Sequence, residues 1–154
     1  MSGTRSYARP VAPHRAWRPT VCLALLVAGL AGCASDRPGR AAADATAQDF
    51  YQAISDADGA KACALLAPAT VHALQEQANQ SCPQAILAGD VGDTLTSRAH
   101  DAADPAATTA GRQAQVTLTT DVVFLTVSGS SWLITAAGCD ARPERPYDCV
   151  VEAS

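Results

Sequence analysis

The sequence predicts an α+β domain in which several helices precede an antiparallel sheet. Apolar residues recur at helical spacing between residues 45 and 89. From residue 113 onward, apolar and polar residues alternate with the period of a β-strand. Helices followed by consecutive strands are typical of folds whose helices pack on one face of an antiparallel sheet. We therefore expect one such domain over residues 45–154, after a separate N-terminal segment.

The globular part is expected to start near Asp44, and the stretch from Thr46 to Asp49 resembles a capping box at the start of the first helix, with Asp in the Glu/Gln place. The apolar stripe of this helix has the spacing of one helical face and consists of Ala47, Phe50, Tyr51, Ile54 and Ala57. Asp58-Gly59 ends this helix, and the Asp58 side chain can cap a second short helix that extends through Leu66.

Two more helices are predicted after the second one. Pro68 suits the first turn of a third helix, which carries Val71, Leu74 and Ala78. Ser81 is expected to cap a fourth short helix that Gly89 ends.

Residues 92–111 have a weak pattern, because Asp, Ala and Thr dominate and Leu95 is the single large apolar residue among them. We expect a first strand at 93–99 and a polar loop at 101–110.

The pattern of residues 113–154 predicts consecutive antiparallel strands. The expected strands are 113–118, 122–127, 131–137 and 147–152. A turn at 119–121 separates the first two of them, and Ser128-Gly129-Ser130 favours a hairpin turn before the third. Trp132, Ile134 and Ala136 should share one face of that third strand.

Residues 1–32 have the layout of a secretory signal peptide. Four arginines and no acidic residue precede an apolar run from Thr20 to Leu30, which is too short to cross a bilayer. Leu30, Ala31, Gly32 and Cys33 resemble the lipobox of bacterial lipoproteins. This resemblance implies a thioether-linked diacylglycerol on Cys33 and cleavage after Gly32. An ordinary signal peptide with a chance cysteine at this place is the alternative.

Residues 33–44 are expected to form a flexible tether after the lipid-bearing cysteine, since Ala is the only apolar residue type from 34 to 43. The whole chain has 11 basic and 15 acidic residues. The signal segment holds four of the basic residues and none of the acidic ones, so the rest of the chain has a net charge of −8. This acidic charge argues against a nucleic-acid partner, which would require clustered Lys and Arg.

The chain contains six cysteines, of which Cys22 belongs to the signal segment and Cys33 to the lipobox. Four cysteines remain, and in an exported domain they predict two disulfides that can be paired in three ways. Proximity in sequence favours the pairs Cys63–Cys82 and Cys139–Cys149. Neither pair has the spacing of a zinc site or of a Cys-x-x-Cys redox motif. We therefore expect no metal and no cofactor.

Several stretches together resemble a known group of proteins. They are the run from Phe50 to Pro68, Cys82, the stretch 114–125, Trp132, and the ending Ala136-Ala137-Gly138-Cys139 with Pro146-Tyr147-Asp148-Cys149. These residues are similar to those of small secreted lipoproteins of high-GC Gram-positive bacteria. The resemblance implies a nuclear-transport-factor-2-like, or cystatin-like, cone of helices packed on a strongly curved antiparallel sheet. It implies no particular activity.

Proteins with this cone fold include ketosteroid-isomerase-like enzymes, polyketide cyclases and binding modules, and the fold does not choose among them. An isomerase-like site needs a carboxylate base together with a Tyr or a protonated acid as oxyanion donor. The polar candidates are Asp49, Tyr51, His72, His100, Asp121, Tyr147 and Asp148. No two of them share a motif, and the chain has no sequence signature of a hydrolase elbow, a zinc protease, a P-loop or a dinucleotide site.

Each of these candidates also has a structural explanation. Asp49 suits a helix cap or an exposed position, and Tyr51 suits the core with its hydroxyl at the edge. Asp121 suits a turn, while His72 and His100 suit solvated positions.

We therefore expect no catalytic residues. The sequence favours a lipid-anchored domain on the outer face of the cell membrane that binds a protein or a small molecule. The alternative is a cone-fold pocket enzyme, isomerase-like or hydrolase-like, at the cell envelope. Convergence of Asp49, Tyr51 or Asp121 with a His on an apolar cavity on the order of several hundred Å³ would favour the enzyme. The binding domain is favoured by a filled core, which would consist of Phe50, Ile54, Leu74, Val116, Phe124 and Trp132.

Overall fold

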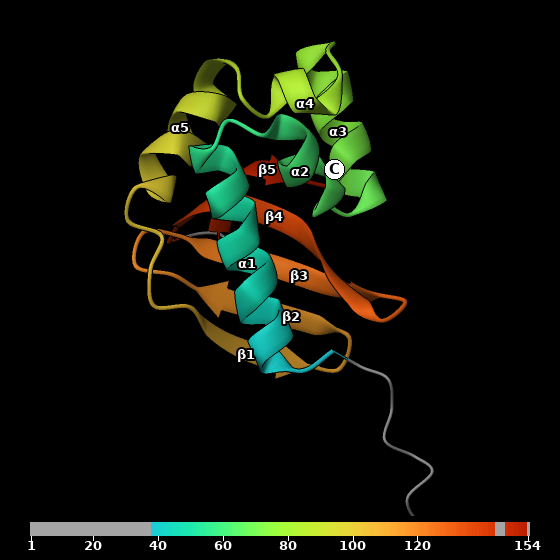
Figure 1. Cartoon of the computed structure of the whole chain (residues 1–154), viewed down its shortest axis with the longest axis vertical. Coiled ribbons are helices and arrows are strands. Elements are labelled where there is room, and N and C mark those ends of the chain that lie inside the picture. Colours follow the sequence, from blue (N-terminus) through green and yellow to red (C-terminus); the bar gives the residue numbers. More distant parts are fainter. Residues whose placement is uncertain (1–37, 144–146, 154) are drawn as a thin grey trace, which may run out of the picture. The chain divides into compact units, whose positions relative to one another are not determined.

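The computed structural model describes residues 38–143 and 147–153, and these residues form five helices followed by a five-stranded antiparallel sheet (Figure 1). The helices are α1 (Arg40–Ser55), α2 (Gly59–Ala64), α3 (Pro68–Ala78), α4 (Cys82–Ala85) and α5 (Gly89–Ala99). The strands are β1 (Ala106–Ala110), β2 (Gln113–Thr117), β3 (Val122–Ser128), β4 (Ser131–Ala141) and β5 (Tyr147–Glu152). The predicted α+β class is therefore confirmed. No helix within the described ranges is long and apolar enough to cross a membrane.

The sheet is an open meander whose spatial order is β1-β2-β3-β4-β5, with every neighbouring pair antiparallel. Helix α1 packs against β1, β2 and β4, whereas α3 and α5 pack against β4 and β5 (Figure 1). The two edge strands are therefore β1 and β5.

The core lies between α1 and the sheet. The predicted apolar stripe of α1 is buried at Ala47, Phe50, Tyr51 and Ile54, whereas Ala57 lies beyond the helix and is exposed. The alternating strands contribute the facing side chains, which are Ala114, Val116, Val123, Leu125, Val127, Trp132 and Ile134. This packing is the main source of stability for helices of this length, because isolated short helices are marginal in water.

Helix α1 begins at Arg40, earlier than both the capping box expected at Thr46 and the start of the globular part expected near Asp44. Thr46 is not a cap but lies inside the helix, where its hydroxyl donates to the Ala42 carbonyl at 2.8 Å. Tertiary contacts support the extra turn, since Ala43 is fully buried and the Trp132 indole N–H donates to the Gly39 carbonyl at 3.1 Å. Residues 40–44 of the tether expected over 33–44 are therefore helical.

The region 92–111 differs most from the expectation. Residues 93–99 form the second half of α5 rather than a strand, and Leu95 and Gly92 are the buried residues of that helix. Gly89 begins α5, with φ +56°, and does not end α4. The first strand, β1, lies inside the expected loop 101–110 and pairs with β2 from Ala106↔Thr117 to Ala110↔Gln113.

Most other local predictions hold. The Asp58 carboxylate accepts from the Lys61 N–H at 3.0 Å and caps α2, and Pro68 is the first residue of α3. Ser81 stands at the N-cap of α4, but its hydroxyl donates to Gln84 and makes no bond to the backbone. Strand β4 runs to Ala141, four residues past the expected end.

The two predicted disulfides are present. Cys63–Cys82 joins α2 to the first residue of α4, and Cys139–Cys149 joins β4 to β5. The predicted signal peptide and the lipobox residues Leu30 to Cys33 lie outside the described residues.

Candidate functional site

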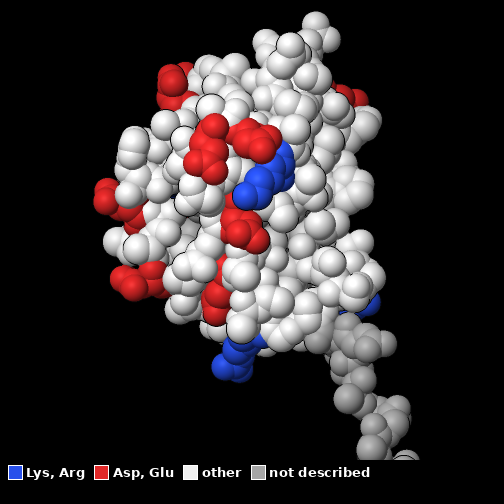
Figure 2. All heavy atoms as spheres, in the orientation of Figure 1, with Lys and Arg blue, Asp and Glu red and all other residues white. Residues whose placement is uncertain are grey.

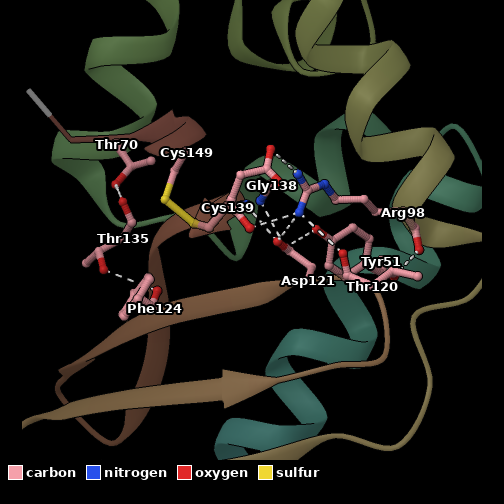
Figure 3. The surroundings of a disulfide bond; sticks show 11 residues. Tyr51, Thr70, Arg98, Thr120, Asp121, Phe124, Thr135, Gly138, Cys139 and Cys149 are labelled. Carbon is pink, nitrogen blue, oxygen red and sulfur yellow. Dashed lines mark hydrogen bonds and ion pairs between the residues drawn. A yellow bond between two sulfur atoms is a disulfide. The ribbon is translucent and has the colours of Figure 1, made fainter. Parts of the chain in front are cut away.

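Asp121 stands at the centre of a buried polar cluster (Figure 3). It follows the turn after β2 and is only 4% exposed. Its carboxylate accepts from the backbone N–H groups of Gly138 at 2.9 Å and Cys139 at 2.7 Å. It also accepts from the Arg98 guanidinium at 2.8 Å and from the Tyr51 hydroxyl. The expectation that Asp121 serves only as a turn former is therefore wrong, because its side chain points into the fold.

The reason for this cluster lies in the unequal lengths of β3 and β4. The β3–β4 register ends at Phe124↔Ala136, so Gly138 and Cys139 of β4 extend past the pairing with β3. Their N–H groups need another acceptor, because an unpaired buried N–H is costly. The Asp121 carboxylate accepts these two hydrogen bonds in place of a neighbouring strand.

Gly138 allows two successive N–H groups to reach one carboxylate. In a regular strand, successive N–H groups point to opposite sides. Gly138 has φ +68°, and a backbone in this left-handed region can turn neighbouring N–H groups toward one anion. A Cβ at this position would collide with the Val150 side chain and would lie 3.3 Å from Leu95 Cδ2. Only glycine fits both the conformation and the space.

Arg98, in the last turn of α5, connects the carboxylate to its surroundings. Its Nη1 lies within hydrogen-bond distance of the Asp121 carboxylate and of the Cys139 and Thr120 carbonyls, the last two at 3.0 and 3.3 Å. Its Nη2 lies 2.9 Å from the exposed carboxylate of Asp140. The Thr120 hydroxyl in turn donates to the Arg98 carbonyl at 2.9 Å. The guanidinium therefore ties α5 to both the β2–β3 turn and β4.

Tyr51 connects the cluster to α1. The residue is 2% exposed, and its ring meets Phe50 edge-on with the centroids 5.2 Å apart. Burial raises the pKa of Tyr51 strongly, and the negative charge of Asp121 raises it further. The phenol therefore stays protonated and donates a hydrogen bond to the carboxylate.

We name Tyr51, Arg98, Asp121, Gly138 and Cys139 the Asp121 network. A carboxylate offers about four lone-pair directions, and four donors already occupy those of Asp121. A general base must contact the proton that it removes, and this carboxylate has no unoccupied side. The network therefore has the properties of a structural link between α1, α5 and the sheet.

The hollow next to the network does not expose its carboxylate. It has a volume of about 310 Å³ and is bordered by Asp49 and Tyr51, with Gln48, Gln52, Ser55, Ala99 and Ala102 as its other lining residues. Asp121 is not among them. This hollow is a polar surface depression and not the apolar cavity that an isomerase-like site would require.

The remaining predicted candidates do not join the network. Asp49, His72 and His100 are exposed, and His72 Nδ1 lies 3.2 Å from Glu76. Tyr147 is half-buried against Phe124, with the ring centroids 5.0 Å apart. Asp148 forms an ion pair with Arg142. Tyr51 and Asp121 are brought together as an isomerase-like site would require, but neither His72 nor His100 accompanies them.

The expected filled core is largely present. Its members Phe50, Ile54, Leu74, Val116 and Trp132 are buried, as the binding-domain hypothesis requires. Phe124 is the exception, because it is half-buried and packs with Tyr147 instead of entering the core.

Sequence reasoning missed Arg98 and Gly138. Arg98 lies in the segment that was expected to be a strand, where it would have seemed unrelated to Asp121. Leu95 and Ala99 have the spacing of a helical face, and this was the signal for α5 that the segment contained. Gly138 carried no local signal, because its role depends on where β3 ends.

Comparisons of the chain with protein-family models, curated proteins and solved structures give no match. Within 38–143 and 147–153, no group of three or more His, Cys, Asp or Glu side chains is arranged to hold a metal ion.

Proposed function

We propose that this protein is a lipid-anchored domain at the outer face of the cell membrane that binds a partner and catalyses no reaction. The observation that carries the proposal is the saturation of the Asp121 network. Tyr51 and Asp121 are the two catalytic candidates that the fold brings together, and the hydroxyl hydrogen of Tyr51 and the four acceptor positions of the Asp121 carboxylate are already engaged. A buried group in this state stabilises the fold and has no free position for a substrate.

The sequence supports the membrane anchor. The basic start, the short apolar run and the residues Leu30 to Cys33 together favour lipidation of Cys33. Two disulfides in a domain of this size are in keeping with an oxidising compartment outside the cytoplasm. Because α1 begins at Arg40, a lipid on Cys33 would hold the first turn of α1 within about 25 Å of the bilayer, even with the intervening chain fully extended.

We also propose that the fold is of the cystatin-like cone type. Its support is the order of elements, with helices first and then an open antiparallel meander crossed by α1. This assignment leaves the choice between binding and catalysis to the site itself.

The anchor is tested by the intact mass of the protein extracted from its native membrane. The expected mass is that of residues 33–154 with a diacylglyceryl group and without four hydrogens, which accounts for cleavage, lipid and both disulfides. A Cys33→Ala variant should accumulate as unprocessed precursor. Normal maturation and membrane retention of that variant would contradict the anchor.

A further inference from the structure

A groove lies at β5, an edge strand of the sheet, and residues of α3, α5 and β5 line it. Its volume is about 570 Å³. The small apolar residues Ala73, Val91 and Val150 line it, together with the carboxylate residues Glu76, Asp90 and Glu152. The groove is separate from the Asp121 network, none of whose residues lines it.

The backbone of Cys149 faces this open edge. Cys139 and Cys149 are directly opposite in the β4–β5 register, and their Cα atoms are 4.0 Å apart. Such a short distance marks a pair of strand residues that do not hydrogen-bond to each other. In agreement, the N–H and C=O of Cys139 bond to Asp121 and Arg98 on the other side of β4. By the same alternation, the N–H and C=O of Cys149 point away from β4.

The outer edge of β5 is open to another strand. Within the described residues, no backbone–backbone hydrogen bond outside the sheet ladder involves residues 147–152. An edge strand with unpaired peptide groups is a template for the addition of an extended segment. Cys149 and Val150 also line the groove, so the edge strand β5 forms one side of it.

The charge of the groove determines what kind of segment fits. Glu76, Asp90 and Glu152 are exposed, and no Lys or Arg is among the lining residues. The described residues include thirteen acidic and five basic residues, and Figure 2 shows acidic side chains predominating on the face that it presents. A negative groove in a negative domain attracts a cationic ligand.

We propose that this groove binds an extended segment of a partner protein that carries Lys or Arg at alternate positions and adds to β5 as a sixth strand. Alternate side chains of a strand point to the same face, so the basic ones can meet the carboxylates while small residues between them cover the apolar lining. The inference rests on the proposed function as a binding domain and names its partner. Pairing of β5 with a second copy is disfavoured, because each copy would bring Asp148 and Glu152 to the interface.

The test uses the full-length chain purified from membranes in a non-ionic detergent and a fluorescein-labelled octapeptide of alternating Lys and Thr. Fluorescence anisotropy should show binding that weakens as the salt concentration rises. A Lys–Pro octapeptide keeps the charge but lacks the N–H donors at alternate positions, and it should bind at least about tenfold more weakly. Equal binding of the two peptides, or no binding of the Lys–Thr peptide, would overturn the proposal.

A charge-matched pair of variants locates the site. The groove variant combines Glu76→Gln, Asp90→Asn and Glu152→Gln. The control variant combines Asp49→Asn, Asp56→Asn and Asp101→Asn at exposed positions outside the groove. We expect the groove variant to bind the Lys–Thr peptide at least about tenfold more weakly and the control to lose less than about threefold. Equal losses would mean that total charge alone governs binding, and the groove would be excluded.

The outcomes separate this inference from the proposed function. If the chain is lipidated and the Lys–Thr peptide does not bind, the groove proposal fails while the membrane-anchored domain stands. If the chain carries no lipid, the anchor fails whether or not the peptide binds.

Discussion

Replacement of Asp121 by Asn tests whether the buried network is structural. The substitution keeps the shape of the side chain, removes its charge and replaces one oxygen by an NH₂ group. Each carboxylate oxygen of Asp121 accepts two hydrogen bonds, so the NH₂ group faces two donors whichever oxygen it replaces. Asp121→Asn therefore loses two bonds and leaves the Arg98 guanidinium without its buried partner.

The expected loss of stability follows from these contacts. A hydrogen bond to a charged group contributes about 1.5–3 kcal/mol, and removal of one partner of a buried ion pair costs about 3–5 kcal/mol. The two estimates describe the same contacts and are not added. Arg98 keeps its exposed partner Asp140, which limits the cost. We therefore expect Asp121→Asn to lose no more than the cost of a broken buried ion pair, about 3–5 kcal/mol. Domains of this size have about 5–15 kcal/mol in total, so the loss would remove a large fraction.

Urea unfolding with both disulfides intact measures this loss, with Trp132 in the core as a fluorescent reporter. Asp140→Asn is the matched control, because Asp140 binds the same guanidinium but its side chain is 76% exposed. That control should lose less than about 1 kcal/mol. A loss below about 1 kcal/mol for Asp121→Asn, or one equal to that of the control, would refute the structural role. Unchanged or increased stability would instead be typical of a carboxylate retained for catalysis at a cost in stability.

Three further predictions concern the same part of the fold. The pKa of Tyr51 is raised in the folded protein, so the stabilising contribution of its protonated hydroxyl is complete below the ordinary pKa of 10.0 and is lost as the pH rises above that value. Urea unfolding from about pH 8 to about pH 11 should therefore show a fall in the free energy of unfolding, and this fall should be smaller in Tyr51→Phe. Gly138→Ala should lower the free energy of unfolding by about 2–4 kcal/mol in the same assay, because it adds a steric collision to an unfavourable backbone angle. The control Gly129→Ala, at φ +60° in open space, should lower it by about 1 kcal/mol. Equal losses would contradict the role of crowding at Gly138. Replacement of both Cys139 and Cys149 by Ser should lower the free energy of unfolding by about 3 kcal/mol in the chain-entropy estimate, and a thermal melt indistinguishable from that of the parent chain would contradict this expectation.

The sequence alone was sufficient for features that depend on residues close to one another along the chain. The apolar spacing of 47–54 predicted the buried face of α1, and the alternation of apolar and polar residues predicted the pattern of burial in β2. The disulfide pairs were predictable because their partners are close along the chain. The cap at Asp58 and the helix start at Pro68 were predictable for the same reason, because each depends on adjacent residues.

Only the tertiary structure determined the remaining features. Helix α5 and strand β1 have weak patterns of their own and are stabilised by packing on β4 and by pairing with β2. The Asp121 network joins residues up to 88 positions apart, from Tyr51 to Cys139, and exists because β4 extends past β3. The open edge of β5 and its carboxylate-lined groove depend on which strand lies last in the sheet. Local sequence patterns do not indicate which distant segments pack against each other. The buried polar contacts and the groove were therefore determined only by the tertiary structure.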